Sequence, residues 1–209
     1  MKNLALLLLV AALPLCAADG DWVSLFNGKD LTGWKANENP ETFTVQDSAI
    51  VSHGPRSHCF YVGSFNNHVF RNFDLTVDVM TLPRANGGIY ILTELEGPGW
   101  PGKGFEAQVN NTFPGDPRKT GSLYEVQDVG ADQNPVKDNE WFTEEVIVQG
   151  DTITVKLNGK QLVHWTQPAG WAGTSDFPGR RIAPGTIALQ GHDAGSTVYY
   201  KNIRIKLLK

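Results

Sequence analysis

The chain has 209 residues and a formal net charge of −4 at neutral pH. A mildly acidic chain without a basic stripe is unsuited to nucleic acid, whose phosphates are bound by clusters of Lys and Arg. Beyond the N-terminus, no apolar run approaches the length of a membrane-spanning helix, so no transmembrane segment is expected.

The first 18 residues have the layout of a secretory signal peptide. Lys2 gives a positive start, residues 4–13 are apolar, and two alanines close the segment at 17–18. We expect cleavage after Ala18, which would give a secreted or periplasmic protein. Cys16 would allow a bacterial lipoprotein anchor instead, but Leu15 before it is larger than such a site normally accepts.

The remaining residues, 19–209, are interpreted as one domain. Loss of Lys2 changes the formal charge from −4 to −5, and Cys59 is then the lone cysteine. One cysteine cannot form an internal disulfide, so the fold must be held by its core. A chain of this length can bury such a core without help.

Strand patterns recur along the chain, and residues 71–80 are the clearest, because Phe73, Leu75, Val77 and Val79 alternate with polar residues. The other expected strands cover residues 43–45, 50–51, 89–93, 104–110, 141–148, 152–157, 161–163, 185–192 and 198–208. No segment keeps a helical period over three turns. The pattern therefore predicts an all-β fold, an antiparallel β-sandwich.

Two long segments rich in Gly and Pro are expected to be loops. Residues 111–139 contain Leu123–Val126 in their middle, which favours an ordered loop lying beside the polar face of the 104–110 strand. Residues 167–184 form the second loop. The Asn86–Gly88 stretch is expected to be a turn that leads into strand 89–93.

Residues 104–110 alternate strictly, with Glu106, Gln108 and Asn110 on the face opposite the apolar residues. A carboxylate beside two amides can bind a sugar or carry out acid–base chemistry, although a merely solvated sheet face is the simpler interpretation. Gln190 and His192 share one face of the 185–192 strand. If both strands belong to one curved sheet, these side chains converge on its concave side.

Aromatic and basic residues in the loops add candidates for substrate binding. Aromatic rings complement the C–H face of a pyranose, which suggests Trp100, Tyr124 and Trp171, whereas Trp141 is better explained by packing. One cation could polarise a carbonyl oxygen. The candidates are Arg84, Arg118, Lys119, Arg180 and Arg181.

Several common kinds of site are missing from the sequence. It has no Cys/His cluster with zinc spacing, no Gly-x-Ser-x-Gly elbow and no glycine-rich nucleotide fingerprint, so no nucleotide cofactor is expected. The carboxylate pair of ordinary glycosidases is also missing around Glu106.

The chain resembles the family of 3-keto-disaccharide hydrolases, formerly a domain of unknown function. The matching segments are Leu25–Trp34, Asn86–Tyr90, Gly104–Val109, Lys119–Tyr124, Glu140–Trp141, Leu157–Gly159, Gly185–His192 and Lys201–Ile203. The last strand departs from the pattern, with Tyr200–Lys201 where Phe-Arg is common. The resemblance implies a concanavalin-like jelly roll and a carbohydrate substrate, a glycoside already oxidised at C3.

Such a substrate implies elimination chemistry, because a ketone at C3 acidifies the proton on C2. On this hypothesis His192 is the base and Glu106 is the acid or a metal ligand. Lys119, or a divalent metal ion held by Glu106 and His192, would face the C3 oxygen. The substrate-binding candidates are Gln108, Asn110, Gln190, Tyr124, Trp100, Trp171 and Arg84.

Two other functions fit the same sequence. A non-catalytic carbohydrate-binding module would use the aromatic residues without needing His192. A two-carboxylate glycosidase would pair Glu106 with Glu94 or Asp128 and would hydrolyse unoxidised glycosides.

Overall fold

The computed structural model describes residues 21–209, so the expected signal peptide and Cys16 lie outside the described residues. In chain order the elements are β1 (Val23–Ser24), β2 (Trp34–Ala36), the short 3-10 helix η1 (Pro40–Thr42), β3 (Phe43–Gln46), β4 (Ala49–His53), β5 (Ser57–Tyr61), the 3-10 helix η2 (Phe65–His68), β6 (Phe73–Thr81), β7 (Gly87–Thr93), β8 (Phe105–Val109), β9 (Phe142–Gln149), β10 (Thr152–Leu157), β11 (Lys160–Thr166), β12 (Thr186–Gly191) and β13 (Thr197–Leu207).

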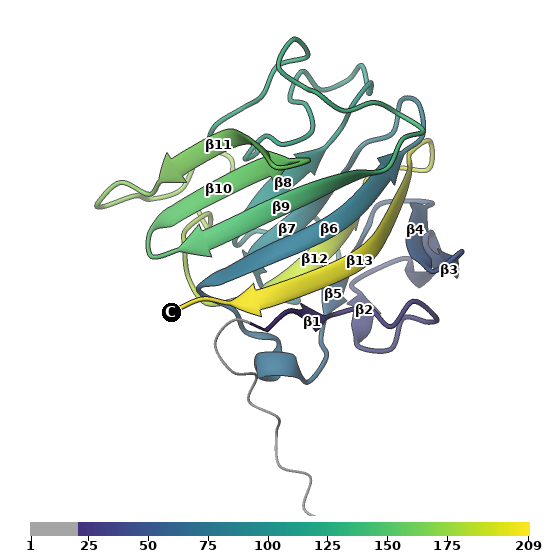
Figure 1. Cartoon of the computed structure of the whole chain (residues 1–209), viewed down its shortest axis with the longest axis horizontal. Coiled ribbons are helices and arrows are strands. Elements are labelled where there is room, and N and C mark those ends of the chain that lie inside the picture. The colour runs from purple at the N-terminus through teal and green to yellow at the C-terminus, as the bar shows by residue number, and fades with distance from the viewer. Residues whose placement is uncertain (1–20) are drawn as a thin grey trace, which may run out of the picture.

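These strands form two antiparallel sheets that pack face to face (Figure 1). Within the described residues, an eight-stranded sheet has the order β11-β10-β9-β6-β13-β4-β3, with β1 paired to β13, and a five-stranded sheet has the order β2-β5-β12-β7-β8. The predicted all-β sandwich is confirmed. No helix within residues 21–209 is long and apolar enough to cross a membrane.

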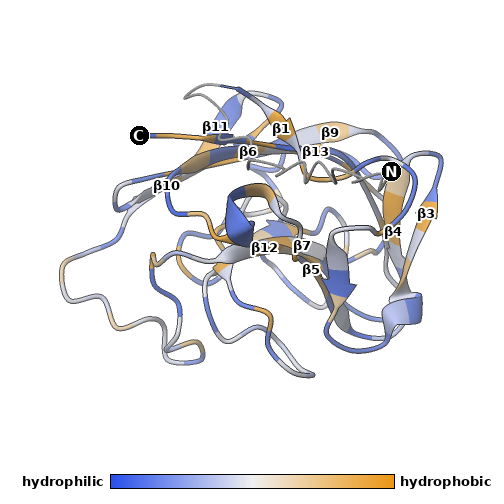
Figure 2. Cartoon of the chain, turned by 90° about the horizontal axis from the view of Figure 1, so that it is seen from below, coloured by the Kyte–Doolittle hydropathy of each residue, from blue (hydrophilic) through white to orange (hydrophobic). Residues whose placement is uncertain are grey.

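The core lies between the two sheets. In β6 the residues from Phe73 to Thr81 alternate between buried and half-buried, as the sequence predicts for a strand with one face in the core. The five-stranded sheet differs, because every residue of β7, β8 and β12 is buried. Figure 2 shows the reason: loops cover the face of this sheet that points away from the eight-stranded sheet.

The expected hairpins are confirmed by their backbone. Asp47 and Ser48 connect β3 to β4 with φ angles of 48° and 59°, and Asn158 and Gly159 connect β10 to β11 with φ angles of 49° and 81°. Two consecutive residues with positive φ are typical of the tight turns that suit twisted hairpins.

The expected turn at Asn86–Gly88 is wrong, because Gly87 and Gly88 are the first residues of β7. A Cβ at Gly87 would lie 2.8 Å from the Tyr200 hydroxyl on the core side of the sheet, and one at Gly88 would lie 2.4 Å from Oε1 of Glu106 on the other side. The two glycines are therefore needed for close packing on both faces of a strand, and the sequence alone suggested only flexibility.

A carboxyl group lies in the apolar core. Glu144 of β9 is fully buried between the sheets, and neither of its carboxyl oxygens has a hydrogen-bond partner within residues 21–209. Burial raises its pKa well above the usual range, and the charge of Glu106 raises it further. Glu144 is therefore held in its neutral form.

We predict that Glu144→Gln weakens the pH dependence of stability. The native protein keeps a proton that the unfolded chain releases above about pH 4.3, so the free energy of unfolding falls as pH rises, by up to about 1.4 kcal/mol per pH unit. Glutamine cannot ionise, so urea unfolding at pH 5 and pH 7 should show a smaller loss in the variant. Glu145→Gln, on the opposite face of β9, is the control for mutating this strand. Equal losses in Glu144→Gln and wild type would contradict the prediction.

Candidate active site

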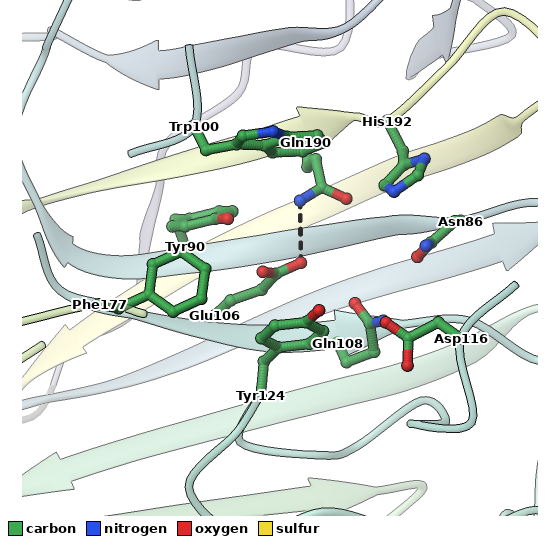
Figure 3. A pocket seen from close by; sticks show the side chains of 10 residues that line it. All are labelled: Asn86, Tyr90, Trp100, Glu106, Gln108, Asp116, Tyr124, Phe177, Gln190 and His192. Carbon is green, nitrogen blue, oxygen red and sulfur yellow. Dashed lines mark hydrogen bonds between the residues drawn. The ribbon is translucent and has the colours of Figure 1, made fainter. Parts of the chain in front are cut away.

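A cavity of about 270 Å³ opens on the loop-covered face of the five-stranded sheet (Figure 3). This volume is near the lower end of the range for small-molecule sites. The strands β7, β8 and β12 form its floor, and the loops that flank these strands form its walls. Its lining residues are Asn86, Tyr90, Trp100, Glu106, Gln108, Asp116, Tyr124, Phe177, Gln190 and His192.

The predicted meeting of two distant strands is confirmed, because Glu106 of β8 and Gln190 of β12 are hydrogen bonded. Gln190 Nε2 donates to Glu106 Oε1 over 2.9 Å, although β7 lies between the two strands. The missing side chain of Gly88 leaves the space over β7 that the Glu106 carboxyl group occupies. Gln108, with its amide nitrogen turned toward Glu106, donates to the same oxygen over 3.1 Å and to the Gly87 carbonyl over 3.0 Å.

Glu106 is a carboxyl group suited to proton transfer near neutral pH. Burial raises its pKa to about 7, while hydrogen bonds from Tyr90 and Gln190 and the charge of Arg180 act in the opposite direction. A carboxyl group that titrates near the working pH can both give and take a proton.

His192 follows β12 and forms a pair with its neighbour Asp193. The distance from His192 Nδ1 to Asp193 Oδ2 is 2.6 Å, and Ser196 Oγ donates to the same oxygen over 2.9 Å. A carboxylate on Nδ1 fixes the tautomer and leaves Nε2 as the free basic nitrogen. His192 lines the cavity.

Trp100 lies on the loop between β7 and β8 and forms one wall of the cavity. Its ring lies 5.3 Å from the ring of His192 and 5.4 Å from that of His58. His58 is fully buried, and burial lowers its pKa to about 3, so its imidazole is neutral. Trp100 itself keeps 43% of its surface exposed, so a ligand can reach the indole.

Side chains near β2 anchor the Trp100 loop. Asn37 Nδ2 donates to the Gly97 carbonyl over 3.0 Å, and the Gly99 amide donates to Glu38 Oε1 over 3.0 Å. Glu38 also forms an ion pair with Arg56 at 2.8 Å. These contacts hold the loop against the five-stranded sheet.

Tyr124 lines the opposite wall, on the loop that follows β8. The Tyr124 amide donates to the Glu106 carbonyl over 3.0 Å, and the Gln108 amide donates to the Ser122 carbonyl over 3.0 Å. The expectation of an ordered loop beside the polar face is confirmed.

Asn110 and Lys119 organise this loop instead of facing the cavity. Asn110 Nδ2 donates to the carbonyls of Asp116 and Arg118, at 3.2 and 2.9 Å. Lys119 Nζ donates to the carbonyls of Phe113 and Asp116, at 2.9 and 3.0 Å, and lies 3.4 Å from Asn110 Oδ1. These contacts position Asp116. They do not support the prediction that Lys119 faces the C3 oxygen of the substrate.

Two further sequence candidates also lie outside the cavity lining. Trp171 packs against Trp165, with 5.2 Å between ring centroids, and its Nε1 donates to the Arg180 carbonyl over 2.7 Å. Arg84 is exposed at a turn, where its amide donates to Thr112 Oγ1 over 2.8 Å. The candidates that the fold does bring together are Glu106, Gln108, Gln190, His192, Tyr124 and Trp100.

The carboxylates considered as a second glycosidase acid lie elsewhere. Glu94 pairs with Lys103 at 2.6 Å, and Asp128 lies 3.4 Å from Arg118. Neither lines the cavity.

Sequence reasoning missed several lining residues, namely Asn86, Tyr90, Asp116 and Phe177. Tyr90 carried a usable signal, since it alternates with the core residues Ile89 and Ile91 of β7. Asp116 and Phe177 lie in irregular loops, where no periodicity indicates the direction of a side chain.

Glu106 and His192 are the predicted ligands for a divalent metal ion. Glu106 and His192 both line the cavity, but Glu106 Oε1 already accepts from Gln190. Across residues 21–209, no group of three or more His, Cys, Asp or Glu side chains could hold a metal ion. Two such ligands fall short of the usual coordination set, so the donor set does not fit a metal by itself.

Hydrogen-bonding side chains between aromatic walls, on one face of a β-sandwich, are features that suit a carbohydrate ligand. The family model described as a 3-keto-alpha-glucoside-1,2-lyase-like domain matches residues 21–206. The chain therefore belongs to this family.

Individual relatives agree with this assignment. The chain is 23% identical to a 3-keto-disaccharide hydrolase of Bacteroides thetaiotaomicron over 91% of this chain and 79% of that protein. A crystal structure from Parabacteroides distasonis, described as a glycosyl hydrolase, has a TM-score of 0.76 at 27% identity and covers 90% of this chain and 94% of its own. A Bacillus licheniformis beta-glucanase (TM-score 0.57, 11% identity, 92% and 99% coverage) shares the fold alone. Together the family and the glycosyl hydrolase relative support a carbohydrate-active hydrolase.

We predict that Gly88→Ala destabilises the protein by about 1–3 kcal/mol, because the new methyl group would overlap Glu106 Oε1. Chemical unfolding measures the loss. In Gly88→Ala/Glu106→Ala the overlapping carboxyl group is absent, so the alanine at 88 should be much less harmful in that background. Gly97→Ala, at a position with open space around it, is the control and should stay within about 0.5 kcal/mol of wild type. An equal loss from Gly88→Ala in both backgrounds would refute this explanation.

Proposed function

We propose that the protein hydrolyses 3-keto-glycosides, such as 3-keto-disaccharides, by elimination followed by hydration. The observation that carries the proposal is that Glu106, with its pKa near 7, and the His192–Asp193 pair belong to one cavity. The family description and the Bacteroides relative support the choice of a 3-keto sugar. The N-terminal sequence supports a secreted or periplasmic location.

The reaction needs one base, one acid and a means of stabilising an enolate. His192 Nε2 removes the C2 proton, and the electron pair of the C2–H bond forms the enolate of the C3 ketone. The enolate then collapses to a C1–C2 double bond as the bond from C1 to the leaving oxygen breaks. Glu106 protonates that oxygen. Water finally adds across the double bond, with hydroxyl at C1 and hydrogen at C2, which completes a net hydrolysis.

Other lining groups bind and orient the sugar. Gln190 Nε2 donates to Glu106, while its Oε1 is buried, has no partner among the described residues and can accept from a sugar hydroxyl. Gln108 orients the same carboxyl group. The exposed indole of Trp100 and the ring of Phe177 offer apolar surfaces to the C–H face of a pyranose.

We predict that His192→Ala and Glu106→Gln each lower turnover of a 3-keto aryl glucoside by about 10²- to 10⁴-fold, the usual contribution of a general acid or base. Release of the aryl group measures the rate, with and without a chelator to test whether a divalent metal ion takes part. His164→Ala, on β11 of the other sheet, is the control and should act like wild type. Binding of plain glycans without turnover of the 3-keto substrate would favour a carbohydrate-binding module instead.

We also predict that the pH profile of kcat/KM falls above about pH 7. The acid must be protonated to act, and the pKa of Glu106 is raised to about 7, so its active form is lost as pH rises through that value. Glu106→Gln should lack this falling limb in its residual rate. A falling limb that persists unchanged in the variant would show that another group supplies the proton.

A further inference from the structure

The proposed elimination creates negative charge on the C3 oxygen, yet no residue that lines the cavity has a permanently charged basic side chain. Negative charge that develops in a water-poor site needs a donor or a cation that is already in place. The basic side chains behind the cavity wall differ in the partners that they already have.

Two of these cations already have oxygen partners around their charge. Lys119 Nζ contacts the carbonyls of Phe113 and Asp116 and the side-chain oxygen of Asn110. The guanidinium of Arg118 lies within 3.4 Å of three carboxylates, those of Asp116, Glu125 and Asp128. Both side chains hold the loop that follows β8, and neither has positive charge to spare for a substrate.

Arg180 differs from both. It comes from the loop between β11 and β12, is only 2% exposed, and lies within 4 Å of no carboxylate of the described residues. Its Nη1 donates to the Tyr124 carbonyl, whereas its Nη2 is buried and has no hydrogen-bond partner in the part of the chain that the structure describes. A buried guanidinium with an unused N–H group is costly to maintain, which suggests a purpose beyond packing.

The position of Arg180 links it to the cavity wall. Its guanidinium carbon lies 3.9 Å from the ring centroid of Phe177 and 5.2 Å from that of Tyr124, and both rings line the cavity. The Tyr124 amide is in turn bonded to the Glu106 carbonyl over 3.0 Å. Arg180 is also close enough for the charge of Glu106 to act on it. The positive charge therefore lies directly behind the wall on the Glu106 side, where the low dielectric extends its reach.

We propose that Arg180 is a positioning residue for the elimination: its buried charge, acting through the wall formed by Tyr124 and Phe177, stabilises the negative charge on the C3 oxygen of the enolate. This inference rests on the proposed function. It assigns to Arg180 the electrostatic role that the family resemblance suggested for Lys119 or for a divalent metal ion.

The test compares Arg180→Met, which removes the charge, with Arg180→Lys, which keeps it. Arg181→Met is the matched control, since Arg181 is the exposed neighbour on the same loop and donates only to the Pro178 carbonyl. Two rates are measured with a 3-keto aryl glucoside: release of the aryl group, and exchange of the C2 hydrogen in deuterated water by NMR. The exchange rate reports formation of the enolate directly.

We expect Arg180→Met to lower kcat and C2 exchange in the same proportion, by about 10- to 100-fold, with KM within about threefold of wild type. Arg180→Lys should recover most of both rates, and Arg181→Met should match wild type. Near-ultraviolet circular dichroism checks that each variant is folded.

Equal losses in Arg180→Met and Arg180→Lys, or a loss confined to KM, would show that Arg180 only holds its loop and would overturn the inference. If the wild-type protein neither releases the aryl group nor exchanges the C2 hydrogen, the proposed function itself fails and the role of Arg180 fails with it. Turnover by wild type that is unchanged in Arg180→Met leaves the function standing and refutes this inference alone.

Discussion

The site depends on one hydrogen bond that reaches over a strand, from Gln190 of β12 to Glu106 of β8. Side chains on alternate strands of a sheet are normally separated by the side chain of the strand between them. Here that strand is β7, and Gly88 leaves its position empty. The carboxyl group of Glu106 can then lie over the backbone of β7, and the floor of the cavity becomes a continuous polar surface.

Burial of this surface gives the carboxyl group its chemistry. Loops cover the polar face of the five-stranded sheet, and the loss of water raises the pKa of Glu106 to about 7. The same loss of water keeps His58 neutral and leaves the charge of Arg180 unscreened. Each of these groups is unfavourable for folding taken alone, and such groups tend to be found where function requires them.

The walls depend on polar contacts that never touch the cavity. Asn110 and Lys119 hold the loop with Asp116 and Tyr124, and Asn37 and Glu38 hold the loop with Trp100. The long irregular segments are therefore held in place by hydrogen bonds between these side chains and the backbone groups of the loops. The two sheets alone would leave this polar face open to water.

The sequence by itself determined most of the strands, though not β1, β2 or β5. It also determined the hairpin turns and the direction of Glu106, Gln108, Gln190 and His192, because alternation along a strand has a fixed period of two and tight turns have strong residue preferences. The family assignment also followed from the sequence. Only the tertiary structure decided that β7 separates the two functional strands, that its glycines belong to the strand, and that Lys119 and Asn110 face the loop instead of the substrate. These features depend on contacts between residues far apart in the chain, and local periodicity contains no information about which distant groups will meet.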